Sequence, residues 1–114
     1  MFPEKNAVDL VTAVLNENLF NNLIHQLNKD FQLANINVQF SESISSKELI
    51  EELSKTIFDL LKNEYDSYLN LIYRVDVSER ELLSLDLNSE DIISDITFLV
   101  LKREAQKVWF KSKF

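Results

Sequence analysis

The chain has 114 residues, of which 46% are apolar and 27% charged, and its 12 basic and 19 acidic side chains give a formal charge of −7. This apolar content excludes an intrinsically disordered chain, and the absence of cysteine excludes a disulfide framework, a zinc–thiolate site and a thiol nucleophile. The absence of glycine excludes phosphate-binding loops and dinucleotide-binding fingerprints, which need glycine for their backbone geometry. We therefore expect one globular domain spanning residues 1–114.

Two amphipathic helices are predicted in the first third of the chain. Asn6 is a candidate N-cap for a short first helix, because a side-chain oxygen at this position can accept from a free amide of the first turn. A longer helix is predicted from about residue 18 to residue 33, where apolar side chains recur at spacings of three and four. Those apolar side chains are Leu19, Phe20, Leu23, Ile24, Leu27 and Phe31.

Residues 36–40 alternate between apolar and polar side chains, with Ile36, Val38 and Phe40 as the apolar ones. This period of two is typical of a strand, but a lone strand needs a partner, which only another protomer would supply here. We therefore interpret residues 35–41 as an extended linker that packs its three apolar side chains onto the helices.

A third helix is predicted to begin after Ser45, since Ser45 and Glu48 have the spacing of a capping box. Its apolar stripe continues as far as Ile72, with a break predicted near residues 63–66. On the outer face, Glu51 and Lys55 are four residues apart and predict a solvated surface of alternating charge.

The last quarter of the chain predicts two further helices. Ser78 begins a second capping box and a short helix, and Asn88 or Ser89 is the candidate cap of a final helix that runs from Ile92 to about Phe110. Within it, residues 96–101 are apolar nearly all round, which predicts the most buried segment of the protein. The predicted fold is therefore all-α: a single compact bundle of five or six helices with one extended linker near residues 35–41.

No arrangement of residues in the sequence predicts catalysis or metal binding. His25 is the single histidine and is interpreted as a polar surface residue. Two groups of carboxylates could bind a divalent cation, but both lie in first turns of predicted helices, where negative charge is favourable for structural reasons. These groups are Glu48, Glu51 and Glu52, and Glu90, Asp91 and Asp95. We expect no catalytic residue, no metal and no cofactor, and a protein that is not an enzyme.

The segment around Tyr73 and Arg74 allows two interpretations. In one, Tyr68, Tyr73, Arg74 and Asp76 form a surface recognition patch. In the other, which we favour, Arg74 closes the carbonyl end of its helix and pairs with Asp76 or Glu79.

Charge is distributed unevenly along the chain. Residues 102–114 contain five basic side chains and one acidic side chain, a net charge of +4, and the remaining residues 1–101 have a net charge of −11. Residues 101–114 form the basic, aromatic C-terminal end of the last helix. Their candidate interaction residues are Lys107, Trp109, Phe110 and Phe114, with Tyr73 and Arg74 as further candidates.

This basic end could pack against its own acidic body or another copy, enter a groove of a partner protein, or contact an anionic membrane surface or a nucleic acid. The acidic body repels phosphates, which argues against nucleic acid. No stretch of the sequence is apolar enough for a membrane span, and no secretory leader is evident, so we expect a cytoplasmic protein.

Two segments of the C-terminal half, residues 71–79 and 99–108, resemble a family of small bacterial proteins of unknown function, and the likeness extends over residues 18–110. The resemblance implies an all-α chain. It implies no activity, cofactor or site residue.

The leading hypothesis is a non-enzymatic helical protein that acts through protein–protein contact, as a homodimer or adaptor that uses the last helix. The alternative is an acidic inhibitor or immunity-type protein that blocks the basic site of a nuclease or DNA-binding protein. Its acidic face would consist of Glu48, Glu51, Glu52 and Asp59. A hydrolase that uses His25 with a carboxylate would require His25 to lie in a cleft with a nearby acid, and an exposed His25 would exclude it.

Overall fold

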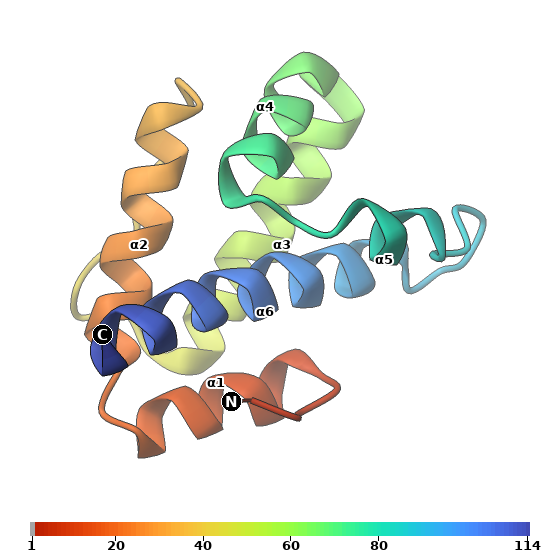
Figure 1. Ribbon diagram of the computed structural model, residues 1–114. Coiled ribbons are helices and arrows are strands. Elements are labelled where there is room, and N and C mark those ends of the chain that lie inside the picture. The colour runs from red at the N-terminus through yellow and green to blue at the C-terminus, as the bar shows by residue number, and fades with distance from the viewer. Residues whose placement is uncertain (1) are drawn as a thin grey trace.

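Six α-helices and no strands are found in residues 2–114, which the computed structural model describes (Figure 1). The prediction of an all-α bundle with an extended linker is confirmed. The helices are α1 (Ala7–Asn16), α2 (Phe20–Leu33), α3 (Ser46–Asn63), α4 (Tyr65–Val75), α5 (Glu79–Leu83) and α6 (Ile92–Lys113).

Helix α6 is the central element of the bundle and contacts each of the other five helices. In Figure 1 it crosses the middle of the molecule, with α1 along one side and α2 and α4 on the other. Val100 and Leu101 are fully buried, and Thr97 is buried with its hydroxyl donating to the carbonyl oxygen of Ile93 at 2.7 Å. The predicted burial of residues 96–101 is confirmed, apart from a half-buried Phe98.

Side-chain caps begin three of the helices as predicted. Asn6 accepts from the amide of Asp9 at 2.9 Å, and Ser45 and Glu48 form a complete capping box. Ser78 accepts from the amide of Glu81 at 3.3 Å, which is one of the two bonds of the second predicted capping box. The predicted cap of α6 is wrong: this helix follows Asp91, which makes no side-chain cap bond. Ser89 instead accepts from the amide of Asp91 at 3.0 Å, within the connection from α5.

Three non-glycine residues with positive φ make the turns for which glycine is usually selected. Asn18 (φ 59°) lies between α1 and α2, Asn35 (φ 60°) follows α2, and Asp76 (φ 67°) ends α4. Asn and Asp tolerate the left-handed region better than other side chains do. The break between α3 and α4 falls at Glu64, within the predicted interval.

The linker is held to α2 by a pair of hydrogen bonds from one side chain. The amide of Asn28 donates to the carbonyl oxygen of Phe40 at 3.0 Å and accepts from its N–H at 2.8 Å. The Phe40 ring is buried and meets Phe31 edge-on, at 5.4 Å between ring centroids. Ile36 and Val38 are half-buried against the core, so the interpretation of residues 36–40 as a linker rather than a strand is confirmed.

Candidate functional site

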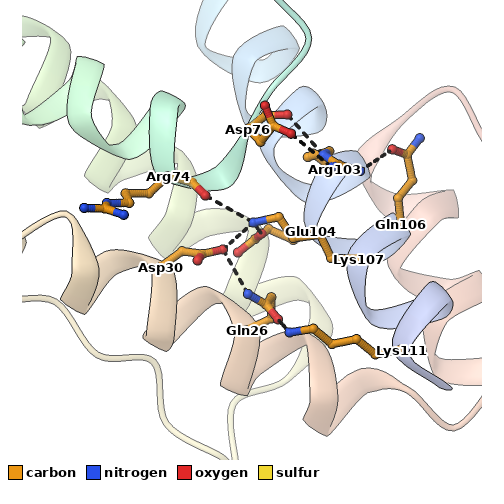
Figure 2. Close-up of polar contacts among 9 residues, drawn as sticks. All are labelled: Gln26, Asp30, Arg74, Asp76, Arg103, Glu104, Gln106, Lys107 and Lys111. Atoms are coloured by element: carbon orange, nitrogen blue, oxygen red, sulfur yellow. Dashed lines mark hydrogen bonds and ion pairs between the residues drawn. The ribbon is translucent and has the colours of Figure 1, made fainter. Parts of the chain in front are cut away.

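Three charged side chains meet where α2, the end of α4 and α6 come together (Figure 2). Lys107 Nζ lies 2.8 Å from Asp30 Oδ2 and 3.1 Å from Glu104 Oε1. The side chains of Asp30, Glu104 and Lys107 are only 5%, 0% and 17% exposed. We call these three residues the carboxyl cluster. One lysine therefore faces two buried carboxyl groups, which leaves the cluster one positive charge short if both are ionised.

Glu104 is the most deeply buried carboxyl group of the cluster, so its ionised form is the least stable. Neither of its carboxyl oxygens has a well-directed hydrogen bond within the part of the chain that the structure describes. Burial and the neighbouring Asp30 carboxyl, only partly opposed by Lys107, together raise the pKa of Glu104 to about 9. Glu104 is therefore protonated and neutral at pH 7.

The pKa of Asp30 is shifted in the opposite direction, below its ordinary value. Burial acts to raise the pKa of Asp30, but the neighbouring Glu104 carboxyl and hydrogen bonds from Lys107 and Gln26 outweigh it and hold that pKa below its ordinary value. The two carboxyl groups thus hold one proton between them, and the remaining negative charge is balanced by Lys107. This division of roles is the usual result when two carboxyl groups share a site.

The cluster is extended at both ends by hydrogen bonds. Gln26 donates to Asp30 at 3.1 Å and accepts from Lys111 at 2.6 Å, so the chain of contacts reaches the surface beside the end of α6. On the other side, Lys107 donates to the carbonyl oxygen of Arg74, in the last turn of α4, at 3.3 Å. The cluster therefore connects α2, α4 and α6.

The predicted pairing of Arg74 is wrong, because another arginine takes its partner. Arg103 of α6 binds Asp76, both through the carboxylate at 3.1 Å and through the backbone carbonyl at 3.1 Å. Arg74 contributes its carbonyl to Lys107, and its guanidinium points away from the cluster in Figure 2. The C-terminal end of α4 is thus held by Arg103 of α6 rather than by Arg74 of α4 itself.

The candidate interaction residues divide between a buried and an exposed group. Lys107 points inward to Asp30 and belongs to the carboxyl cluster. Tyr73 is 79% exposed on α4, and Arg74 beside it is also exposed. At the end of α6, Phe110 and Phe114 are 44% and 95% exposed, while Trp109 is half-buried against the core.

The three aromatic side chains at the end of α6 contact one another. Phe110 stacks on Phe114 at 6.2 Å between ring centroids and meets Trp109 edge-on at 5.5 Å. Lys113 lies 5.6 Å from the centroid of the Trp109 ring, close enough for a cation–π contact. We call Trp109, Phe110 and Phe114 the terminal aromatic surface.

The proposed acidic face of α3 is exposed but not uniformly acidic. Glu48, Glu51, Glu52 and Asp59 all lie at the surface. Glu48 is engaged in the capping box, and hydrogen bonds from the Ser45 side chain and backbone lower its pKa. Lysines also project from this helix; they are Lys47, Lys55 and Lys62.

His25 is an exposed side chain that lines an open groove at the surface. Its side chain is 62% exposed and its Nε2 is 2.7 Å from an oxygen of Glu42, which is 76% exposed. Glu42 is the nearby acid that the hydrolase hypothesis requires, but the exposure of His25 argues against that hypothesis. Among residues 2–114, no group of three or more histidine, aspartate or glutamate side chains is placed to hold a metal ion.

The carboxyl cluster was not predicted, although the sequence contained a sign of it. Glu104 stands four residues after Val100 and four before Val108, in the middle of an apolar stripe. Asp30 likewise follows Leu27 by three residues on the buried face of α2. A charged residue at an apolar position of an amphipathic helix predicts a buried charge, but it does not say which group pairs with it.

Comparison with known proteins gives no relative of this chain: no family model, curated protein or solved structure matches it. The resemblance to small bacterial proteins stays an expectation. Among the helices of residues 2–114, none combines the length and the apolar character needed to cross a bilayer.

Proposed function

We propose that this protein is a non-enzymatic helical module of the cytoplasm that acts by binding a protein partner through the terminal aromatic surface. The observation that carries the proposal is the exposure of Phe110 and Phe114, two stacked rings that leave much of their apolar area in water. Exposed aromatic side chains rimmed by polar groups are typical of the centres of protein interfaces.

Charge indicates the chemistry of that partner. Lys113 lies over the Trp109 ring, Lys111 follows Phe110 in the chain, and both lysines are exposed. Neither forms an ion pair with a carboxylate in residues 2–114. A surface that combines an apolar pocket with a rim of acidic side chains would complement both features. Residues 1–101 of a second copy carry the required sign of charge, so self-association is measured first.

The test compares two double variants of the full chain. Phe110→Ala/Phe114→Ala should lose the partner, whereas Leu83→Ala/Leu87→Ala, which removes two side chains that are each 78% exposed elsewhere, should keep it. The partner is captured from native cells, identified, purified and titrated against each variant, and light scattering reports the mass of the protein alone. Equal binding by the two variants, or equal self-association, would show that the interface lies elsewhere.

The acidic inhibitor remains the second candidate. Its support is the net charge of −7 and the exposure of Glu51, Glu52 and Asp59 on α3. The lysines on the same helix reduce the negative potential that such an inhibitor would use to attract a basic site. An association rate that falls steeply with salt, and that is lost in Glu51→Gln/Asp59→Asn but not in Phe110→Ala/Phe114→Ala, would favour this candidate over the first.

A further inference from the structure

A groove of about 300 Å³ lies between α2 and the last turns of α6. None of the residues that line it is acidic, although the protein has 19 acidic and only 12 basic residues. Gln26 and Val108 are its buried members. The exposed members are Asn22, His25, Lys29, Lys111 and Ser112.

We propose that this groove binds a small phosphate monoester, with Lys29 of α2 and Lys111 of α6 as its two cationic contacts. Neither lysine forms an ion pair with a carboxylate in residues 2–114. His25 lines the same groove, but its Nε2 lies 2.7 Å from a carboxylate oxygen of Glu42, so the two lysines are the cationic contacts. Lysine and hydroxyl or amide donors are the groups that usually hold phosphate oxygens.

Lys111 is held in place before any ligand binds. Its ammonium donates to Gln26 Oε1 at 2.6 Å, and Gln26 is 92% buried with its own amide nitrogen bonded to Asp30 (Figure 2). An ammonium group has three donors, so two remain for an anion. Because the lysine is already ordered, less side-chain entropy is lost on binding than for a free surface lysine.

The size of the groove and the charge of the protein select a small ligand. Its volume of about 300 Å³ is at the lower end of the range for small-molecule sites. A nucleic acid or an anionic membrane would approach the whole protein, whose net charge of −7 repels an extended negative surface. A small monoester interacts mainly with the charged and polar side chains that line the groove.

The binding test uses the ¹⁵N-labelled full chain, titrated with inorganic phosphate and with glycerol 3-phosphate against sodium chloride of equal ionic strength. Backbone amide shifts in residues 22–29 and 108–112 should saturate, with a dissociation constant on the order of millimolar. Lys29→Ala/Lys111→Ala should weaken binding by about tenfold or more, because each charge-assisted hydrogen bond contributes strongly. Lys47→Ala/Lys55→Ala on α3 is the matched control and should leave the affinity unchanged.

A second arm separates a free monoester from a lipid headgroup. The protein is sedimented with vesicles of phosphatidylcholine, with and without phosphatidic acid, and should stay in the supernatant in both cases. Shifts that do not saturate, or that saturate equally in Lys29→Ala/Lys111→Ala, would overturn the site. If the protein binds phosphatidic acid vesicles while the free monoesters cause no saturating shifts, the proposal of a small free ligand would be wrong. Circular dichroism of each variant checks that the fold is retained.

Discussion

Asp30 and Glu104 lie on different helices and share one counter-ion, since their carboxyl oxygens are 2.8 and 3.1 Å from the same Lys107 ammonium. Their environments push the two pKa values apart, so one carboxyl group is ionised and the other is neutral at pH 7. The predictions below begin with this pair, because a buried carboxyl group makes the stability of a protein depend on pH.

Glu104→Gln should remove the pH dependence of stability that Glu104 imposes. In the unfolded chain Glu104 loses its proton near pH 4.5, and in the folded protein it does so near pH 9. Between these values the folded state holds one more proton, so its stability falls as pH rises, by at most about 1.4 kcal/mol per pH unit. Glutamine keeps the shape of the protonated acid and cannot ionise.

The variant should therefore match the wild type near pH 5 and exceed its stability near pH 8, as measured by urea unfolding followed by circular dichroism. Glu52→Gln, an exposed site on α3, is the control and should leave the pH profile parallel to that of the wild type. A Glu104→Gln profile that runs parallel to the wild type over this range would show that Glu104 is ionised in the fold.

Lys107→Met should destabilise the protein strongly at pH 7. The substitution keeps an unbranched apolar side chain but leaves the buried charge of Asp30 without its cation, at a cost of about 3 kcal/mol. Adding Asp30→Asn removes that charge and should restore part of the lost stability. If the double variant is no more stable than Lys107→Met alone, the ion pair is not the cause of the loss.

Asn28→Ala should loosen the linker without unfolding the bundle. It leaves the N–H and carbonyl of Phe40 without their partner, which costs about 1–3 kcal/mol where the groups stay buried. Hydrogen exchange of the Phe40 amide should become faster while the amides of α6 keep their protection. Asn22→Ala, an exposed asparagine of the same helix, is the control; equal effects of the two variants would contradict the role of Asn28.

Asn35→Ala should cost about 1 kcal/mol, because alanine at φ 60° brings its Cβ close to the backbone carbonyl oxygen. Asn35→Gly should be nearly neutral, since glycine adopts this conformation without that strain but loses more entropy on folding. Thermal unfolding of the two variants gives the comparison. A loss that is the same for alanine and glycine would assign the role of Asn35 to its side-chain contacts.

The helices were predictable because each is encoded by its own residues. Asn6, Ser45 and Ser78 mark helix starts, and the apolar spacing of α2 and α3 marks the buried faces. The start of α6 at Ile92 was predicted correctly, but its N-cap was not, because Ser89 caps a turn before the helix with the same kind of hydrogen bond that an N-cap would make. Local chemistry does not distinguish these two uses of a serine.

The candidate sites were less predictable, since they depend on pairs of residues distant in the chain. Lys107 was selected for its charge as an interaction residue, yet its ammonium is directed to Asp30, which lies in another helix. Phe110 and Phe114, which were also selected as interaction residues, are exposed at the end of α6. Only the packing of α6 on α2 decides which of its basic side chains point inward.

The position of α6 in the chain has a consequence for how the protein reaches its fold. Helix α6 contacts every other helix, and it is the last of the six to leave the ribosome. Until it emerges, the apolar faces of α1, α2 and α3 lack the element that covers them, so the nascent chain exposes surface that attracts other proteins. Folding is completed late and through contacts between distant segments, which predicts slower folding than in a bundle joined only by neighbouring helices.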